Sequence, residues 1–136
     1  MLTIIHWLVS VALVATLHEA AHVAMARAHG LAVRRIGFSW IGPYVVRERS
    51  ESGPVNAAVS LAAPALNLAL TLLFWRIAPE FAHINLQLAI ISGLPCFPAS
   101  DGKTALLALR GKLKKVPRER VIEPGARAFF RAELNN

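Results

Sequence analysis

Two histidines and a glutamate stand in the order His18-Glu19-Ala20-Ala21-His22 in the first quarter of the chain. Residues four apart lie on one face of a helix, so both imidazoles can bind one metal ion. Glu19 lies one position further round and can act as general base toward a water molecule on that ion. The pattern is typical of zinc-dependent hydrolysis. It predicts Zn²⁺ as cofactor, His18 and His22 as metal ligands and Glu19 as a catalytic residue.

The segment around these three residues is apolar on every face. The apolar run extends from Leu2 to about Ala28 and carries almost no other charge. On an ordinary amphipathic helix the same three residues would form a solvated surface and would need no metal. Here the flanks 9–17 and 20–26 leave no solvated face for them. An ionisable cluster at bilayer depth is costly, and this favours the metal site.

The composition is that of a membrane protein. The chain has 136 residues, of which 55% are hydrophobic and 17% charged, and its mean hydropathy is +0.48. These values exclude a typical soluble domain and favour a small integral membrane protein with one domain. The net charge of +7 could suggest a nucleic-acid partner. However, the basic residues lie outside the apolar runs, so the lipid bilayer is the expected partner and nucleic acid is not.

Three apolar segments predict an all-α polytopic membrane protein with transmembrane segments at about 2–29, 55–78 and 84–110. The first lacks the basic start and small-residue exit of a signal peptide, and Gly30 is expected to end its helix. Pro64 predicts a local break in the second segment. The third is interrupted around Pro95 and Pro98, and such a break is tolerated in a membrane only where it is buried in protein or lines a wet cavity.

A β-hairpin is expected between the first two segments. Residues 31–49 are rich in apolar and aromatic residues and contain Gly42-Pro43, which predicts two strands around a Gly-Pro turn. Residues 1–110 would then form the core, with 111–136 as a basic cytoplasmic tail. Basic residues after the first segment and in the tail share one side, so the expected orientation in a prokaryotic cell membrane is N-out and C-in.

Two further polar residues occur in the apolar segments. Asn67 lies in the second and Asp101 opens the last helical part of the third. Taken alone, Asp101 could be a plain helix cap and Asn67 an interhelical hydrogen bond. Together with the two histidines, Asp101 would complete a tetrahedral site made of His18, His22, Asp101 and water.

With these motifs the chain resembles the site-2 protease family of intramembrane zinc metalloproteases. His18–His22 matches the family's HExxH, residues 62–67 (AAPALN) resemble its Gly-Pro-x-x-Asn segment, and 94–102 (LPCFPASDG) its Pro-rich segment ending in Asp-Gly. The chain departs from the pattern in three places, one of which is the absence near Ser92 of the asparagine that often opens the Pro-rich segment. Ala63 replaces a glycine, and two residues rather than one separate Pro98 from Asp101. The resemblance covers the chain up to about Leu109 and corresponds to a minimal three-span core.

The resemblance implies a metalloendopeptidase that cleaves transmembrane segments of membrane-protein substrates in regulated intramembrane proteolysis. It implies that His18, His22 and Asp101 bind zinc, and that Glu19 is the base. Asn67 would be a catalytic residue that holds the substrate or its oxyanion. The hairpin would be re-entrant and would pair with an unwound substrate strand. The sequence leaves open whether an unidentified regulatory partner supplies substrate selection.

Two other classes of function use similar residues. A non-catalytic pseudoprotease that binds a membrane helix would fit the altered spacing before Asp101, but it has no need of Glu19. A metal transporter or sensor would need further acidic or histidine ligands along a pathway through the membrane segments, and the sequence offers none.

Overall fold

The chain folds into a small helical assembly with one β-hairpin. The structure is a computed structural model that describes residues 2–39 and 42–113. Most of the predicted basic tail, together with Trp40 and Ile41 of the predicted hairpin, lies outside this range. The elements in chain order are α1 (Leu2–Ala28), β1 (Val33–Ser39), β2 (Gly42–Arg47), α2 (Gly53–Phe74), α3 (Pro79–Gly93) and α4 (Asp101–Leu109).

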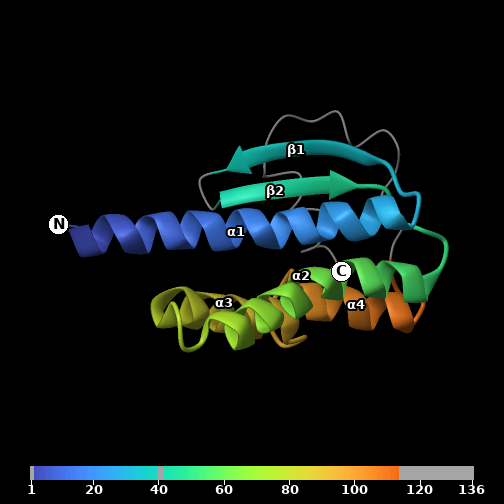
Figure 1. Cartoon of the computed structure of the whole chain (residues 1–136). Coiled ribbons are helices and arrows are strands. Elements are labelled where there is room, and N and C mark those ends of the chain that lie inside the picture. The colour runs from blue at the N-terminus through green and yellow to red at the C-terminus, as the bar shows by residue number, and fades with distance from the viewer. Residues whose placement is uncertain (1, 40–41, 114–136) are drawn as a thin grey trace.

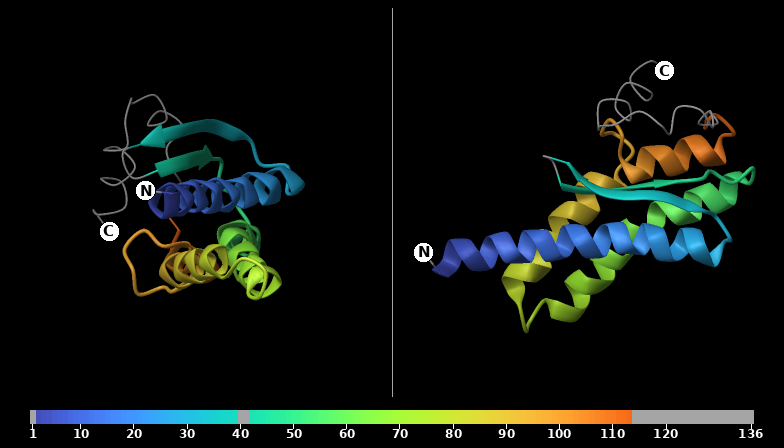
Figure 2. Two further views of the ribbon diagram at one scale, coloured as in Figure 1. Left: turned by 60° about the vertical axis from the view of Figure 1, so that its left-hand side comes forward. Right: turned by 90° about the horizontal axis from the view of Figure 1, so that it is seen from above.

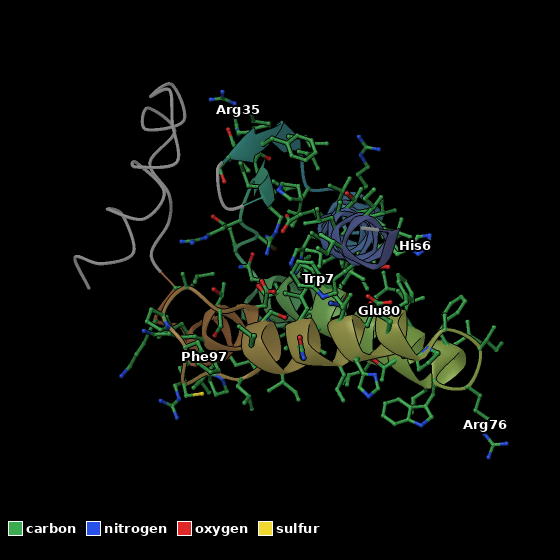
Figure 3. All side chains as sticks on the ribbon, turned by 90° about the vertical axis from the view of Figure 1, so that its left-hand side faces the viewer. His6, Trp7, Arg35, Arg76, Glu80 and Phe97 are labelled. Atoms are coloured by element: carbon green, nitrogen blue, oxygen red, sulfur yellow. The ribbon has the colours of Figure 1, made fainter. Side chains whose placement is uncertain are left out.

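The elements form three layers, and α1 is the middle one. The hairpin runs along one side of α1, and α2, α3 and α4 lie on the other side (Figure 1). In the view along α1, Arg35 projects outward from the hairpin, whereas Arg76 projects from the far side of the helical layer (Figure 3). Helix α1, which carries both histidines, therefore lies between the hairpin and the other helices in these views, and Arg47 of β2 reaches past it to Ser60 of α2.

Helix α1 agrees with the first predicted segment to within one residue. Gly30 ends it as expected, with φ of 69° in the left-handed region, where glycine carries no Cβ penalty. The backbone N–H of Leu31 donates to the carbonyl oxygen of Ala26 at 2.9 Å and closes the helix end. The chain then turns directly into β1.

Helix α2 is continuous through Pro64, so the predicted local break is wrong. Pro64 is buried, and a Cβ added to Gly93 of α3 would lie 3.3 Å from its Cβ. Packing against a neighbouring helix holds the proline in place, as it commonly does in apolar helices that pack closely. The helix also ends at Phe74, earlier than the predicted residue 78.

The third segment begins earlier than predicted. Helix α3 begins at Pro79, not at residue 84, because proline is well suited to the first helical turn and Glu80 lies favourably near the positive end of the helix dipole. The predicted interruption is present, since 94–100 is not helical and α4 begins at Asp101. Among the described residues, only α1 and α2 are long and apolar enough to cross a membrane.

The hairpin contains the two antiparallel strands that were predicted, but the Gly-Pro dipeptide predicted as its turn is part of a strand. Gly42 pairs with Ser39 and Pro43 with Phe38, so the dipeptide belongs to β2. The strand register therefore decided the place of these two residues more than their turn-forming tendency did.

Small residues fill the interior and large apolar residues cover the outside. The buried apolar residues are mostly alanines, namely Ala26, Ala57, Ala63, Ala82, Ala89, Ala105 and Ala108. By contrast, Leu72 is 80% exposed and Ile77 78% exposed. Small residues let helix backbones approach closely when no water drives the association. A surface of exposed leucine and isoleucine marks a face made to contact another apolar phase or partner.

Gly102 marks the closest approach between α3 and α4. A Cβ at this position would lie 1.9 Å from the carbonyl oxygen of Gly93 and 3.0 Å from the carbonyl carbon of Leu94. The start of α4 therefore rests directly on the backbone at the end of α3. This contact fixes where Asp101, the preceding residue, enters the molecule.

Candidate metal centre

The two histidines of α1 face one carboxylate from α4. His18 Nε2 lies 3.1 Å from Asp101 Oδ2, and His22 Nε2 lies 3.3 Å from Asp101 Oδ1. The imidazole rings are nearly perpendicular, with centroids 5.1 Å apart. All three side chains are largely removed from solvent, with exposures of 8%, 12% and 23% in the order His18, His22, Asp101. The structure thus brings together three groups that the sequence separates by up to 83 residues.

A backbone contact sets the orientation of His22. Its Nδ1–H donates to the carbonyl oxygen of Val59 in α2 at 2.8 Å. A neutral imidazole that donates from Nδ1 presents a lone pair at Nε2. That lone pair faces a carboxylate oxygen of Asp101, so two acceptors oppose each other. A proton or a metal cation between them satisfies both, and metal-bound histidines commonly donate their other N–H to a backbone carbonyl in this way.

The separations are compatible with a metal ion held between these side chains. Zinc ligands at about 2.0–2.1 Å lie roughly 3.3 Å from one another in a tetrahedron, and the two histidine nitrogens lie 3.1 and 3.3 Å from different oxygens of Asp101. His18, Glu19 and His22 also form a group whose donor atoms lie within 4.8 Å of one another and could hold a metal ion. Glu19 is thus near enough to serve either as a ligand or as a base for a neighbouring water molecule.

Asn67 lies behind His18, away from solvent. Its Nδ2 is 3.3 Å from His18 Nδ1, and the residue is 0% exposed. Its Oδ1 is buried with no hydrogen-bond partner among the described residues. The structure therefore brings Asn67 to the site as predicted, but on the side of the imidazole opposite Asp101.

The break before α4 aims Asp101 at the histidines. Ser100 caps α4, because its Oγ accepts from the Lys103 N–H at 3.1 Å and donates to the carbonyl oxygen of Leu94 at 2.7 Å. Ala99 adopts φ of 58°, a left-handed conformation that is uncommon for alanine. With two residues between Pro98 and Asp101, the Asp101 carboxylate lies at the two histidines.

Two hollows adjoin Glu19. A groove of about 400 Å³ lies between α1 and the hairpin, and Ala20 and Ala24 of α1 and Phe38 of β1 are among its lining residues. A smaller cavity of about 180 Å³ is lined by Glu19, His18 and Pro43, among others. Because Glu19 lines both, the carboxylate that could act as base is in contact with open space on the hairpin side of the helix.

Sequence reasoning missed two groups around the site. One is the Val59 carbonyl, a backbone group that no side-chain pattern reveals. The other is Arg47 at the end of β2, whose Nη2 donates to Ser60 Oγ of α2 at 3.3 Å. Burial, and after it the charge of Arg49, lower the pKa of the Arg47 guanidinium, while the charge of Asp101 acts in the opposite direction. Arg47 stays a cation and ties the hairpin to the helix that orients His22.

The chain was compared with protein-family models, with curated proteins and with solved structures, and no match was found. The resemblance to the site-2 protease family rests on the three sequence motifs described above, and each motif contributes at least one residue to the cluster of His18, His22, Asn67 and Asp101.

Proposed function

We propose that this protein is a zinc-dependent intramembrane endopeptidase that cleaves membrane-spanning segments of other proteins. The observation that carries the proposal is the convergence of His18, His22 and Asp101 on one point beside Glu19. Two nitrogens and a carboxylate with room for one water molecule are the donor set of a catalytic zinc site, whereas structural zinc sites are closed by four protein ligands.

Insertion in a membrane is part of the proposal. Two helices of suitable length and hydropathy support it, as does the outer surface of exposed leucine and isoleucine around an interior of small residues. Helices α3 and α4, joined by the non-helical stretch 94–100, would together form the third span. The proposed orientation is N-out and C-in, which leaves the basic residues that follow α1 on the inner face.

The chemistry is assigned residue by residue. When bound, zinc would polarise the scissile carbonyl and make a water molecule more acidic. Glu19 would take a proton from that water as its oxygen adds to the carbonyl carbon. Glu19 would then deliver the proton to the departing amide nitrogen, so that the C–N bond breaks to give a carboxylic acid and an amine. His22 keeps its orientation through Val59 O during these steps.

The groove beside Glu19 is the proposed place for the substrate. A helix hides its carbonyl groups in hydrogen bonds, so a membrane-spanning substrate has to unwind before it can be cut. The groove is lined mostly by apolar side chains from α1 and the hairpin. An extended apolar segment between them would place a carbonyl group next to Glu19, and a free strand edge of the hairpin could pair with its backbone.

The test separates catalysis from binding. Glu19→Gln should retain zinc near one equivalent per chain and the wild-type melting temperature, because the amide replaces a base and not one of the three proposed ligands. Cleavage of co-expressed single-span membrane proteins should fall by about a hundredfold or more. Glu80→Gln is the matched control, since Glu80 is exposed in the first turn of α3, and it should cleave like the wild type.

Three outcomes count against the proposal. Full zinc retention in both His22→Ala and Asp101→Ala would contradict the metal centre. Unchanged cleavage in Glu19→Gln would contradict the assigned base. The protein would be the pseudoprotease instead if the wild type and Glu19→Gln bind membrane helices equally tightly and the wild type cuts none of them.

A further inference from the structure

The environment of His18 presents a conflict for metal binding. In the arrangement described above, the Asn67 amide donates from Nδ2 to His18 Nδ1 at 3.3 Å. A neutral imidazole that accepts at Nδ1 carries its proton on Nε2. His18 Nε2, which faces Asp101 at 3.1 Å, then has no lone pair for a metal. The same arrangement leaves Asn67 Oδ1 buried without a partner among the described residues.

A half-turn of the Asn67 carboxamide removes the conflict. The oxygen and the NH₂ group of an amide occupy nearly the same space, and hydrogen bonding decides which lies where. With the amide turned, Oδ1 accepts from His18 Nδ1–H, and the Nε2 lone pair is directed at Asp101 and the site. The turned Nδ2 then occupies the place of the unpartnered Oδ1, and an asparagine NH₂ group within a helix can donate to the carbonyl four residues earlier, as Asn85 Nδ2 does to Phe81 O at 2.9 Å.

We infer that Asn67 is a positioning residue that holds His18 with its Nε2 toward the metal, and that Asn67 does not itself hold the substrate or the oxyanion. Burial supports this assignment, because Asn67 is 0% exposed and lines neither hollow next to Glu19. His18 and His22 are then oriented in the same manner. Each gives its Nδ1–H to an oxygen of α2, the side-chain oxygen of Asn67 in one case and the carbonyl of Val59 in the other.

This inference rests on the proposed function, and two substitutions at one position test it. Asn67→Asp retains an acceptor for Nδ1–H and removes the donor. Asn67→Leu has a similar volume and neither group. The prediction is a zinc affinity in Asn67→Asp within a few-fold of the wild type, and a loss of about 10- to 100-fold in Asn67→Leu, the range usual for an outer-shell partner of a metal ligand. If Asn67 were instead an oxyanion donor, both variants would keep the zinc affinity of the wild type and lose only cleavage.

The measurement is a zinc competition titration on the full chain in detergent, with a chelating dye as competitor. Thr71→Val is the matched control. Thr71 lies one turn further along α2, is 4% exposed, and donates to Asn67 O at 2.8 Å without reaching His18. It should therefore bind zinc like the wild type. Should Asn67→Leu fail to fold, ¹⁵N NMR of the histidines in the zinc-loaded wild type gives the answer, because His18 should show a protonated Nδ1 and a metal-bound Nε2.

Each remaining outcome overturns the inference. Equal zinc affinity in Asn67→Leu and the wild type overturns it alone and leaves the proposed function standing. Three further results overturn the inference alone. They are a zinc affinity in folded Asn67→Asp as low as in Asn67→Leu, a loss of zinc affinity of the same size in Thr71→Val, and binding of zinc by His18 through Nδ1. A wild-type protein that binds no zinc overturns the proposed function, and this inference with it.

Discussion

Replacement of Gly102 by alanine should displace the Asp101 carboxylate, although it substitutes none of the three proposed metal ligands. The new Cβ would lie 1.9 Å from the Gly93 carbonyl oxygen, whereas ordinary carbon–oxygen contacts begin at about 3.3 Å, so the ends of α3 and α4 must separate by roughly 1.4 Å. The clash is with backbone on both sides and no flexible side chain can relieve it. Overpacking of this kind typically costs about 1–3 kcal/mol of stability.

The consequence for the site is larger than the consequence for the fold. Asp101 is the neighbour of Gly102, so its carboxylate must move with the start of α4. Its oxygens lie 3.1 and 3.3 Å from the histidine nitrogens, and bonds from carboxylate oxygen to zinc are about 2.0–2.2 Å long. A shift of this size removes one ligand. Misplacement by about 1 Å also commonly costs on the order of a hundredfold in rate.

The assay compares Gly102→Ala with Gly111→Ala. Gly111 has φ of 65°, and a Cβ there would meet no atom within 4 Å. Its replacement should therefore cost about 1–2 kcal/mol of backbone strain and nothing in packing. Both variants should melt below the wild type, but only Gly102→Ala should lose zinc and cleavage. Zinc content and cleavage at the wild-type level in folded Gly102→Ala would refute the claim that this contact positions Asp101.

Two other predictions concern the groove and the orientation in the membrane. Ala24→Phe should narrow the groove and lower cleavage by about 10- to 100-fold, while zinc content stays at the wild-type level. Ala28 is exposed and does not line the groove, so Ala28→Phe should change neither cleavage nor zinc content. Equal cleavage in the two variants would exclude the groove as the substrate path. A cysteine at Lys112 in a Cys96→Ser background should be labelled by a membrane-impermeant reagent only after the inner face is opened, and labelling of intact cells would reverse the orientation.

The parts of the site that follow from local geometry could be predicted from the sequence. Residues His18 and His22 share a helical face because of their spacing alone, and Gly30 ends α1 because of its own conformational freedom. Asp101 could be placed at a helix start because the prolines before it interrupt the preceding helix. In each case the relevant physics acts within a few residues of the chain.

The parts that depend on packing between elements could not be predicted. Pro64 suggested a break in α2, but its contact with Gly93 keeps the helix continuous. Gly42 and Pro43 suggested a turn, but strand pairing places them in β2. Asn67 was found as a polar residue in an apolar segment, yet its position behind His18 depends on how α1 and α2 pack. The role of the Val59 carbonyl depends on the same packing.

The distribution of the site over α1 and α4 has a mechanical consequence. His18 and Asp101 are 83 residues apart in the chain, and the N-terminal part of α1 extends beyond the other helices (Figure 2). An ion held by both helices is a cross-link that closes a long loop of chain. A covalent cross-link over a loop of this length is worth about 4 kcal/mol or more. If the proposed ion is bound, metal loading would therefore favour the attachment of the first helix, and a chelator should lower the melting temperature of the protein.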